Sequence, residues 1–208
     1  MNSIINRKFR YTYSNSATML IVANCIVFLV AYLLYPAITY YFALIPSAII
    51  YGHSYWQFVT YMFTHSGFWH LFSNMLGLFI FGTAVERAVG TREFLLFYFL
   101  TGILSGIASF FFYIFTGTNA ILLGASGALY AVMLLFSVIY PRAVVYLFGV
   151  FPVRAPILVL GYFFIELFSQ MNSYGGGIAH MTHLFGLVFA LLYCVIRLRI
   201  KPWRVWFS

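Results

Sequence analysis

The chain has 208 residues, of which 64% are hydrophobic and 7% charged, too little charge to cover a water-soluble domain, so the composition predicts one all-α polytopic membrane domain. The formal net charge of +8 does not indicate a nucleic-acid partner, because the basic residues stand at the ends of apolar segments, where they set membrane orientation. The sequence contains no Asp and no HExxH motif, which excludes aspartyl intramembrane proteases and Asp-based proton pumps and removes the main support for a zinc metalloprotease.

The chain opens with a basic, polar tail over residues 1–14, and the first apolar segment follows at about residues 15–35. A signal peptide has this order too, but the apolar part is too long and no small-residue cleavage site follows it, so we expect a retained helix. Residues 36–68 carry no formal charge and many aromatic side chains. This composition predicts short helices lying in the membrane interface rather than a long loop.

Five further apolar segments complete a predicted bundle of six transmembrane helices over residues 15–197, followed by a second basic tail, 198–208. The fourth segment is short: Ser126 to Arg142 gives about 24 Å of helix at 1.5 Å per residue, against a hydrocarbon core of about 30 Å. Ser126 is therefore expected inside the bilayer. The later helices are predicted at about residues 69–85, 93–115, 126–140, 153–171 and 178–196.

The eleven Lys and Arg residues are confined to one side of this predicted topology. They lie in the two tails, in the connection after the second helix, and in the connection after the fourth helix with the start of the fifth. The positive-inside rule then predicts that both termini are cytoplasmic. The small size and the lack of a transit segment favour a bacterial inner membrane.

Several polar side chains are predicted at one depth within the spans, where such residues are functional suspects by default. Counted from the basic residue that ends each helix, Ser126, His183, His70 and Asn74 all lie about 20–26 Å from the cytoplasmic face, by the helical rise per residue. His70 and Asn74 are four residues apart and share a helix face.

These residue types suggest acyl-transfer chemistry. A serine hydroxyl is a weak nucleophile until a base removes its proton, which His183 could do for Ser126. The side chains of His70 and Asn74 and the backbone N–H of Ser126 could then stabilise an oxyanion.

Small residues on the fourth and sixth helices are expected to allow the close approach that joins these groups. On the fourth helix they are Gly127 and Ala131, and on the sixth they are Gly186 and Ala190.

Four motifs stand in order along the predicted spans. A GxSG pattern spans residues 124–127, HxxxN spans 70–74 within the segment that begins at His65, GxxxE spans 82–86 with Gly90 after it, and a two-histidine motif spans 179–186. Each is weak alone, but together they resemble the rhomboid intramembrane serine proteases over about residues 55–190.

The resemblance implies that Ser126 and His183 form a dyad that cleaves peptide bonds of transmembrane helices without metal or cofactor. Membrane-spanning proteins and the lipid bilayer are then the expected partners. The resemblance groups Gly124 with the oxyanion residues. Around the dyad it places Tyr130, stacked on the histidine, together with His180 and Gly186; the glycine three residues after His183 favours His183 over His180 as the base.

The sequence departs from the family pattern at two positions. Gln57 follows Trp56 where the family has Arg, which puts the anchoring of the first loop in doubt, and Ala190 replaces a second glycine on the last helix. The substrate is expected to enter between the second and fifth helices, past Phe163 and Phe168.

Two polar residue types remain outside the dyad. Glu166 lies near the level of Ser126 and could orient His183 as the third member of a triad, but we expect it to face the water-filled opening near the last connection. Glu86 is expected to hold the cytoplasmic end or its loop, and His53 and His65 to be structural.

Two other functions fit parts of the pattern. The first is a catalytically inactive rhomboid-like protein that binds clients, against which the intact Ser126 and His183 argue. The second is a metal or small-solute transporter that uses the five histidines, for which carboxylate and thiol ligands at depth are nearly absent.

Overall fold

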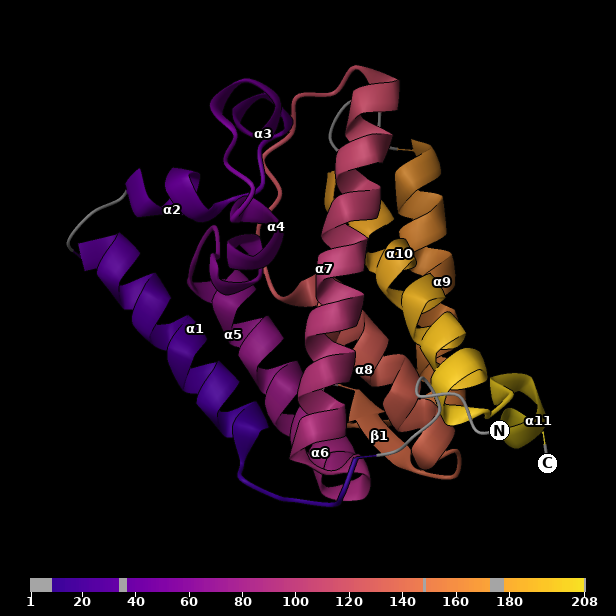
Figure 1. Ribbon diagram of the computed structural model, residues 1–208. Helices are drawn as coiled ribbons and strands as arrows, with labels where there is room; N and C mark the ends of the chain where they lie inside the picture. The colour runs from indigo at the N-terminus through magenta and orange to yellow at the C-terminus, as the bar shows by residue number, and fades with distance from the viewer. Residues whose placement is uncertain (1–8, 34–36, 148, 173–177, 208) are drawn as a thin grey trace, which may run out of the picture.

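The structure is a computed structural model that describes residues 9–33, 37–147, 149–172 and 178–207. Its long helices stand side by side in one bundle, with a group of short helices against one end (Figure 1). The first long helix, α1 (Ser16–Leu33), is followed by α2 (Ala37–Phe42), α3 (Pro46–Gly52), α4 (Gln57–Thr60) and a 3₁₀ turn (Tyr61–Phe63). The short helices expected over residues 36–68 are therefore present, while the predicted end of the first helix at residue 35 lies outside the described residues.

The second long helix runs without a break from Phe68 to Val89. It consists of α5 (Phe68–Gly77), a π-helical turn (Leu78–Gly82) and α6 (Thr83–Val89), so it extends four residues past its predicted end at residue 85. Gly90, at φ +84°, separates it from α7 (Thr91–Thr116), which starts two residues before the predicted 93. Only a glycine adopts such a φ without strain.

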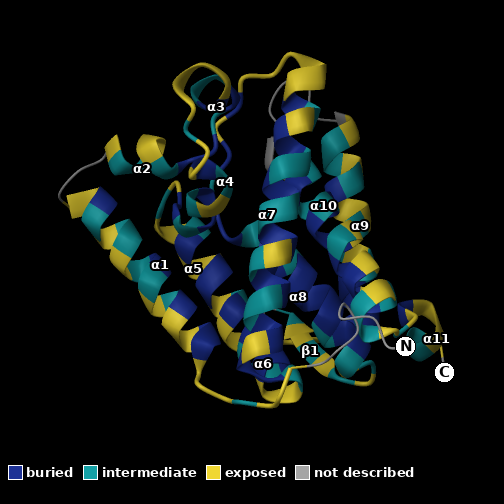
Figure 2. Ribbon diagram, in the orientation of Figure 1, coloured by how far each residue is buried: buried dark blue, intermediate teal, exposed yellow. Residues whose placement is uncertain are grey.

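The shortest of the main helices, α8 (Ser126–Ile139), lies in the middle of the bundle. Ten of its 14 residues are buried, and Figure 2 shows it dark blue behind α7. Its start lies well below the upper ends of α7 and α10, and the preceding loop descends to reach it (Figure 1). A short helix that begins inside the bundle places its first residue, Ser126, within the protein rather than at its surface.

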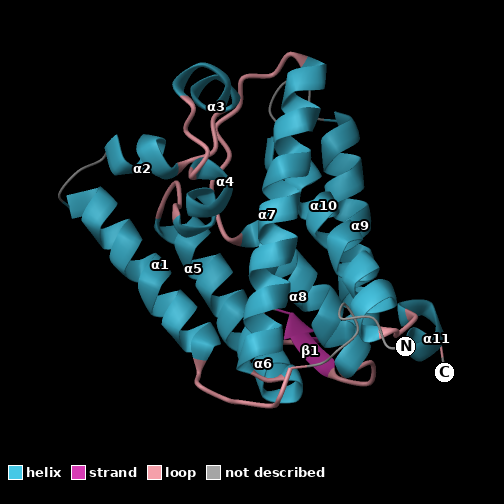
Figure 3. Cartoon of the chain, in the orientation of Figure 1, coloured by secondary structure: helices cyan, strands magenta, loops and turns pink. Residues whose placement is uncertain are grey.

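A β-hairpin follows α8 and was not predicted. Its strands, β1 (Val144–Leu147) and β2 (Phe151–Arg154), pair antiparallel with Val145 opposite Val153, and Figure 3 shows β1 at the lower end of the bundle. The fifth helix, α9 (Ala155–Asn172), therefore starts two residues later than the predicted 153. Pro152, which the prediction left just outside the helix, lies within β2, and the β-branched and aromatic residues of β1 favour a strand.

The last long helix combines α10 (Ile178–Tyr193) with a π-helical turn (Cys194–Leu198). The predicted tail after it contains a short helix, α11 (Pro202–Trp206), which was not predicted. By length and composition, four helices of the described chain can cross a membrane: Ser16–Leu33, Phe68–Val89, Thr91–Thr116 and His180–Leu198. The apolar helices α8 and α9 are shorter, so the predicted count of six spans stays a prediction.

One end of the bundle, the lower end in Figure 1, contains the starts of α1, α7 and α9, the ends of α6, α8 and α10, the hairpin and α11. We call it the basic end, because the described Lys and Arg residues are on these segments, in the connections between them or in the stretch before α1. Two buried carboxylates hold it together. Glu86 accepts hydrogen bonds from the backbone N–H groups of Ser16 and Ala17 at 2.8 and 2.9 Å, as expected of a residue that fixes this end. Glu93 pairs with Arg197 at 2.6 Å.

Candidate active site

Ser126 and His183 meet between α8 and α10. Ser126 Oγ lies 2.7 Å from His183 Nε2, which is hydrogen-bond range. The two helices come this close because Gly127 and Gly186 face each other, and a Cβ at position 186 would lie 2.1 Å from the carbonyl oxygen of Gly127. Glycine is thus a requirement at position 186, and the expected contact between small residues positions the two reacting groups.

The ring of His183 is held in one orientation. It stacks on Tyr130 with 4.3 Å between ring centroids and 7° between planes, as the resemblance implied. The His183 side chain is 14% exposed. With Nε2 directed at the serine hydroxyl, an unprotonated Nε2 can accept its proton.

His70 and Asn74 lie on α5 across from Ser126. The backbone N–H and the hydroxyl of Ser66 both reach His70 Nδ1, at 3.5 and 3.1 Å. If both donate, the ring hydrogen is left on Nε2, which faces the loop before α8. The Asn74 amide donates one hydrogen to the His70 carbonyl at 2.8 Å and has a second. Both side chains line the cavity that holds Ser126.

Gly124 serves this site differently from what its grouping with the oxyanion donors suggested. Its N–H donates to the Tyr61 carbonyl at 2.9 Å, so it is not free to bind an oxyanion. Its φ is +113°, and a Cβ there would lie 2.7 Å from His70 Nε2. Glycine is required because it leaves space for His70 beside Ser126.

A cavity of about 540 Å³ opens over the two reacting residues. Its walls come from α5, the π-turn after it, α8, the hairpin and α9. On α9 the cavity is lined by Leu158 and Tyr162. Phe163 and Phe168, named from the sequence as the residues beside the substrate's path, do not line it, because they stand on other faces of α9. The spacing of Leu158, Tyr162 and Glu166 by four residues is a helix-face signal that would have identified the right wall.

The structure contradicts the expectation that Glu166 faces a water-filled opening. The residue is 6% exposed, and its carboxylate lies 3.0 Å from His183 Nδ1 and 2.5 Å from His180 Nδ1. It also accepts a hydrogen bond from the Tyr130 hydroxyl. His180 thus contacts Glu166 rather than Ser126. Glu166, His180 and His183 also carry possible metal-ligating atoms within 4.8 Å of one another.

The remaining polar residues named from the sequence lie away from Ser126. His53 is exposed, and its Nδ1 is 3.2 Å from the Tyr55 hydroxyl. His65 is buried, with its ring edge-on to His70 at 5.0 Å between centroids. Burial, followed by the nearby His70, lowers the pKa of His65 to about 3. A neutral His65 adds no positive charge beside the oxyanion residues.

The two departures from the family pattern fit their surroundings. Gln57 is buried; it accepts the Ile45 N–H at 3.0 Å and donates to the Tyr41 carbonyl at 3.3 Å. The neutral side chain therefore anchors the loop that an arginine was expected to anchor. Ala190 is fully buried.

The family model for the Rhomboid domain matches residues 52–200, the greater part of the chain, and includes every residue of the site described above. The chain belongs to the rhomboid family.

This rhomboid is an integral membrane protein with relatives in bacteria and organelles. It is 34% identical to the rhomboid protein YdcA of Bacillus subtilis over 64% of this chain and 62% of that one. It is 37% identical to RHOMBOID-like protein 12, mitochondrial, of Arabidopsis thaliana over 59% and 41%, and 40% identical to the rhomboid protease GluP of Bacillus subtilis over 42% and 18%. The chain therefore spans less than two thirds of the length of these relatives.

Proposed function

We propose that this rhomboid is an intramembrane serine endopeptidase that hydrolyses peptide bonds in or near the transmembrane segments of other membrane proteins. The observation that carries the proposal is the 2.7 Å contact between Ser126 Oγ and His183 Nε2 beneath a cavity that reaches the space between α5 and α9. Relatives named as rhomboid proteases support the same reaction class.

In the first half of the reaction, His183 Nε2 takes the proton of the Ser126 hydroxyl while Oγ attacks the carbonyl carbon of the scissile peptide. The carbonyl oxygen becomes an oxyanion. His70 Nε2, the free hydrogen of the Asn74 amide and the Ser126 N–H are the candidate donors to it. The last of these belongs to the first turn of α8, whose N–H groups have no partner within the helix.

The intermediate collapses when the peptide C–N bond breaks and His183 gives its proton to the departing amine. Water then enters the cavity and loses a proton to His183 as it attacks the acyl carbon. Cleavage of the acyl–Oγ bond returns the proton to Ser126 and releases the new carboxyl end. No step consumes a cofactor.

The substrate is expected to be a membrane-spanning segment that unwinds locally. A peptide bond within a regular helix has its carbonyl engaged in the i to i−4 hydrogen bond and covered by side chains, so attack needs an extended stretch. Because α5 and α9 both line the cavity, we expect the substrate to enter between these two helices. A crosslink between these helices should block cleavage of a transmembrane substrate, and full activity of the crosslinked protein would contradict this route.

For the topology, we propose that α8 and α9 cross the bilayer together with the four longer helices. Both chain ends then lie on the side of the basic end, which the positive-inside rule makes cytoplasmic. We keep the bacterial inner membrane as our prediction for the compartment. Reporter fusions at both ends test the orientation, and a periplasmic signal from either end would contradict it.

The deciding experiment compares the purified protein with Ser126→Ala on a generic transmembrane substrate and with a fluorophosphonate probe. We expect cleavage and probe labelling in the wild type and neither in the variant, with the same thermal unfolding. If the folded wild type neither cleaves nor labels, the inactive, client-binding alternative replaces this proposal. Cleavage that survives Ser126→Ala would contradict the assigned nucleophile.

A further inference from the structure

A buried carboxylate lies directly behind the Ser126–His183 pair. The Glu166 side chain is 7% exposed, and an isolated carboxylate at this depth in a membrane protein would be strongly unfavourable. Its two oxygens have three neighbours: the Tyr130 hydroxyl and His183 Nδ1 at Oε1, and His180 Nδ1 at Oε2. Each can donate a hydrogen to an ionised carboxylate.

The negative charge beside His183 favours one of the two ring nitrogens as the carrier of its hydrogen. To accept the proton of Ser126, Nε2 must be unprotonated, so the hydrogen of the neutral ring must be on Nδ1. Nδ1 is the atom that lies 3.0 Å from Glu166 Oε1. A carboxylate there favours the reactive tautomer and stabilises the imidazolium that forms when the serine proton is transferred.

Two further side chains hold the Glu166 carboxylate in place. The Tyr130 hydroxyl fixes Oε1, and the same tyrosine stacks on the His183 ring. His180, one turn before His183 on α10, fixes Oε2 at 2.5 Å. The Nδ1–H of His183 is not aligned with Oε1 as a regular hydrogen bond, so in the resting site the carboxylate acts on the ring mainly through its charge.

We propose that Glu166 is a positioning residue that orients His183 and stabilises its protonated form. The serine–histidine dyad then becomes a serine–histidine–glutamate triad, with Tyr130 and His180 holding the carboxylate in place. This inference rests on the proposed function, because a positioning residue has a role only if His183 acts as a base. The alternative is that Glu166 stabilises the fold, as the two glutamates at the basic end do.

The test separates activation of the serine from substrate binding and from folding. Glu166→Gln keeps the size of the side chain but removes its charge and can present an amide hydrogen to Nδ1. We expect kcat and the rate of fluorophosphonate labelling at Ser126 to fall together. The fall should be at least about tenfold and at most the ~10⁴-fold loss that the wrong histidine tautomer causes in a known triad. KM should change less than threefold, and Glu166→Asp should recover part of the labelling rate.

Ile165→Ala, an exposed neighbour on α9, is the matched control and should label like the wild type. A wild-type labelling rate in folded Glu166→Gln would overturn the proposal. If Glu166→Gln unfolds, the folded Glu166→Asp protein carries the test, because its carboxylate is withdrawn from Nδ1 by one methylene, and a labelling rate that this shift leaves unchanged would overturn the proposal. A change confined to thermal stability would also overturn it. A wild type that neither labels nor cleaves would refute the proposed function instead, so the two failures are distinguishable.

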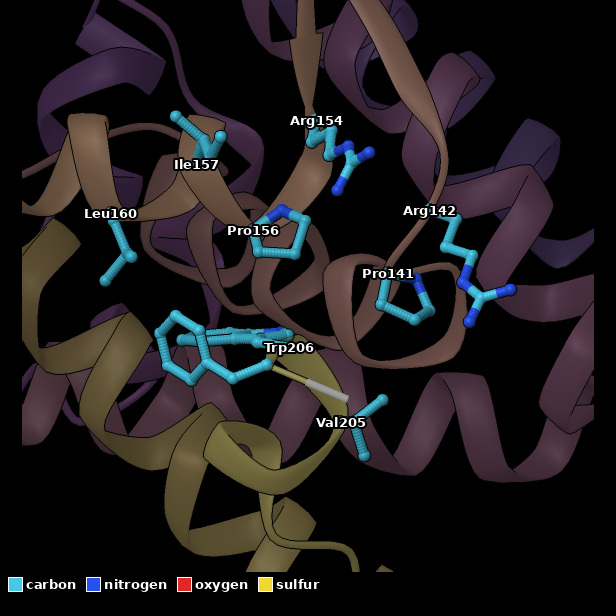
Figure 4. Close-up of a pocket in the computed structure, with 9 residues that line it drawn as sticks. Pro141, Arg142, Arg154, Pro156, Ile157, Leu160, Val205 and Trp206 are labelled. Carbon is cyan, nitrogen blue, oxygen red and sulfur yellow. The ribbon is translucent and has the colours of Figure 1, made fainter.

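A second pocket, of about 250 Å³, lies at the basic end, at the opposite end of α8 from Ser126 (Figure 4). It forms where the turn after α8, the start of α9 and α11 meet. Figure 4 shows Arg154 above Pro156 and Arg142 beside Pro141, with the ring of Trp206 beneath.

The charge in this pocket is not compensated by the described part of the chain. Arg142 and Arg154 are exposed and have no acidic or hydrogen-bonding partner among the described residues. The three acidic side chains of the sequence are all bonded elsewhere. The indole N–H of Trp206 is buried and has no acceptor within the described residues.

One wall of the pocket is apolar and open to the surroundings, because Ile157 is 60% exposed at its rim. We infer that the pocket binds the phosphate headgroup of an anionic phospholipid, with the two guanidinium groups and the indole N–H as donors and an acyl chain along Ile157. Basic pockets of this kind between helices on the cytoplasmic side are suited to such headgroups. A free phosphate would use the same donors but not the apolar wall.

The experiment uses the whole protein in nanodiscs of phosphatidylcholine, with or without phosphatidylglycerol, and with inorganic phosphate as a separate arm. We expect phosphatidylglycerol, but not phosphate, to raise the unfolding temperature and to co-purify after exchange into detergent. Changing Arg142 and Arg154 together to Gln should at least halve the retained phosphatidylglycerol. Arg92→Gln, an exposed arginine at the same end, should retain wild-type amounts. Equal retention in all three proteins, or an equal response to phosphate, would overturn the inference.

Discussion

The basic end and the region beside the cavity both bury glutamate side chains, but the two regions give these carboxylates different partners. At the basic end, Glu86 accepts from two backbone N–H groups and from the hydroxyls of Ser16 and Thr91, and Glu93 accepts from Arg197. Beside the cavity, Glu166 faces two imidazoles and a phenol.

The difference between the two regions lies in the partners. Backbone amides and guanidinium groups keep their hydrogens at any pH at which the protein is folded, so Glu86 and Glu93 act as fixed bonds between helices. Histidines exchange protons near neutral pH, so Glu166 can influence a reaction. Burial of a carboxylate therefore does not by itself indicate function. The predictions below test this division between a structural end and a reactive one.

The largest effect is expected from Arg197→Met. The variant leaves Glu93 buried with the Tyr193 hydroxyl but no cation, and breaking a buried pair from one side costs about 3–5 kcal/mol. Denaturant titration in detergent micelles measures the loss. Changing Glu93 to Gln in the same protein should recover part of it, because the uncompensated charge is then gone. Arg204→Met, on the exposed face of α11, is the control; an Arg197→Met protein as stable as that control would contradict the fixed-bond account.

Gly186→Ala should act on the reactive end. The added methyl would lie 2.1 Å from the Gly127 carbonyl oxygen, so α10 must move away from α8 and His183 must move away from Ser126. A displacement of about 1 Å at a reacting centre can lower the rate about 100-fold. The rate of fluorophosphonate labelling reports this directly. Gly161→Ala on α9 is the control, because a Cβ at position 161 would have no neighbouring atom within 4 Å, and this variant should label at the wild-type rate. Equal labelling rates in the two variants would refute the close-contact argument.

Glu86→Gln should weaken the fold and leave the chemistry unchanged. Gln keeps one acceptor oxygen, but its NH₂ group must then face a donor of the α1 start that Glu86 now accepts from. One buried donor left without an acceptor costs about 1–3 kcal/mol. The folded fraction should label at Ser126 at the wild-type rate. A slower rate in fully folded protein would show that the two ends are not independent.

Much of this arrangement could be predicted from residue patterns. The apolar segments, the short fourth helix and the confinement of basic residues to one side depend on composition and spacing, and each has its counterpart in the structure. Small residues at positions 127 and 186 indicated a close helix pair, and the structure brings the predicted Ser126 and His183 together across it. Local patterns determine these features.

Other features depend on contacts between distant segments, and the sequence did not reveal them. The hairpin after α8 lies in a basic, apolar stretch that suits a helix start equally well. Apolar side chains surround most of α9 and obscure the side that meets α10, so Glu166 was assigned to the wrong surroundings, although its four-residue spacing from Leu158 and Tyr162 indicates the wall of the cavity. Gly124 was expected among the oxyanion donors, but its N–H donates to the Tyr61 carbonyl, which belongs to a distant segment of the chain.

Ala190→Gly tests the boundary between the two regions and should have the smallest effect. Ala190 lies on α10 between His183 and Arg197 and is fully buried, at a position where the family pattern has glycine. Glycine inside a helix is less stable than alanine by about 0.5–1 kcal/mol, so the variant should unfold slightly earlier. Its labelling rate at Ser126 should not change, because Gly186 and not position 190 sets the distance between the reacting groups. A faster rate in Ala190→Gly would mean that the methyl group holds α8 and α10 apart, and that the packing below the site limits how closely Ser126 and His183 approach.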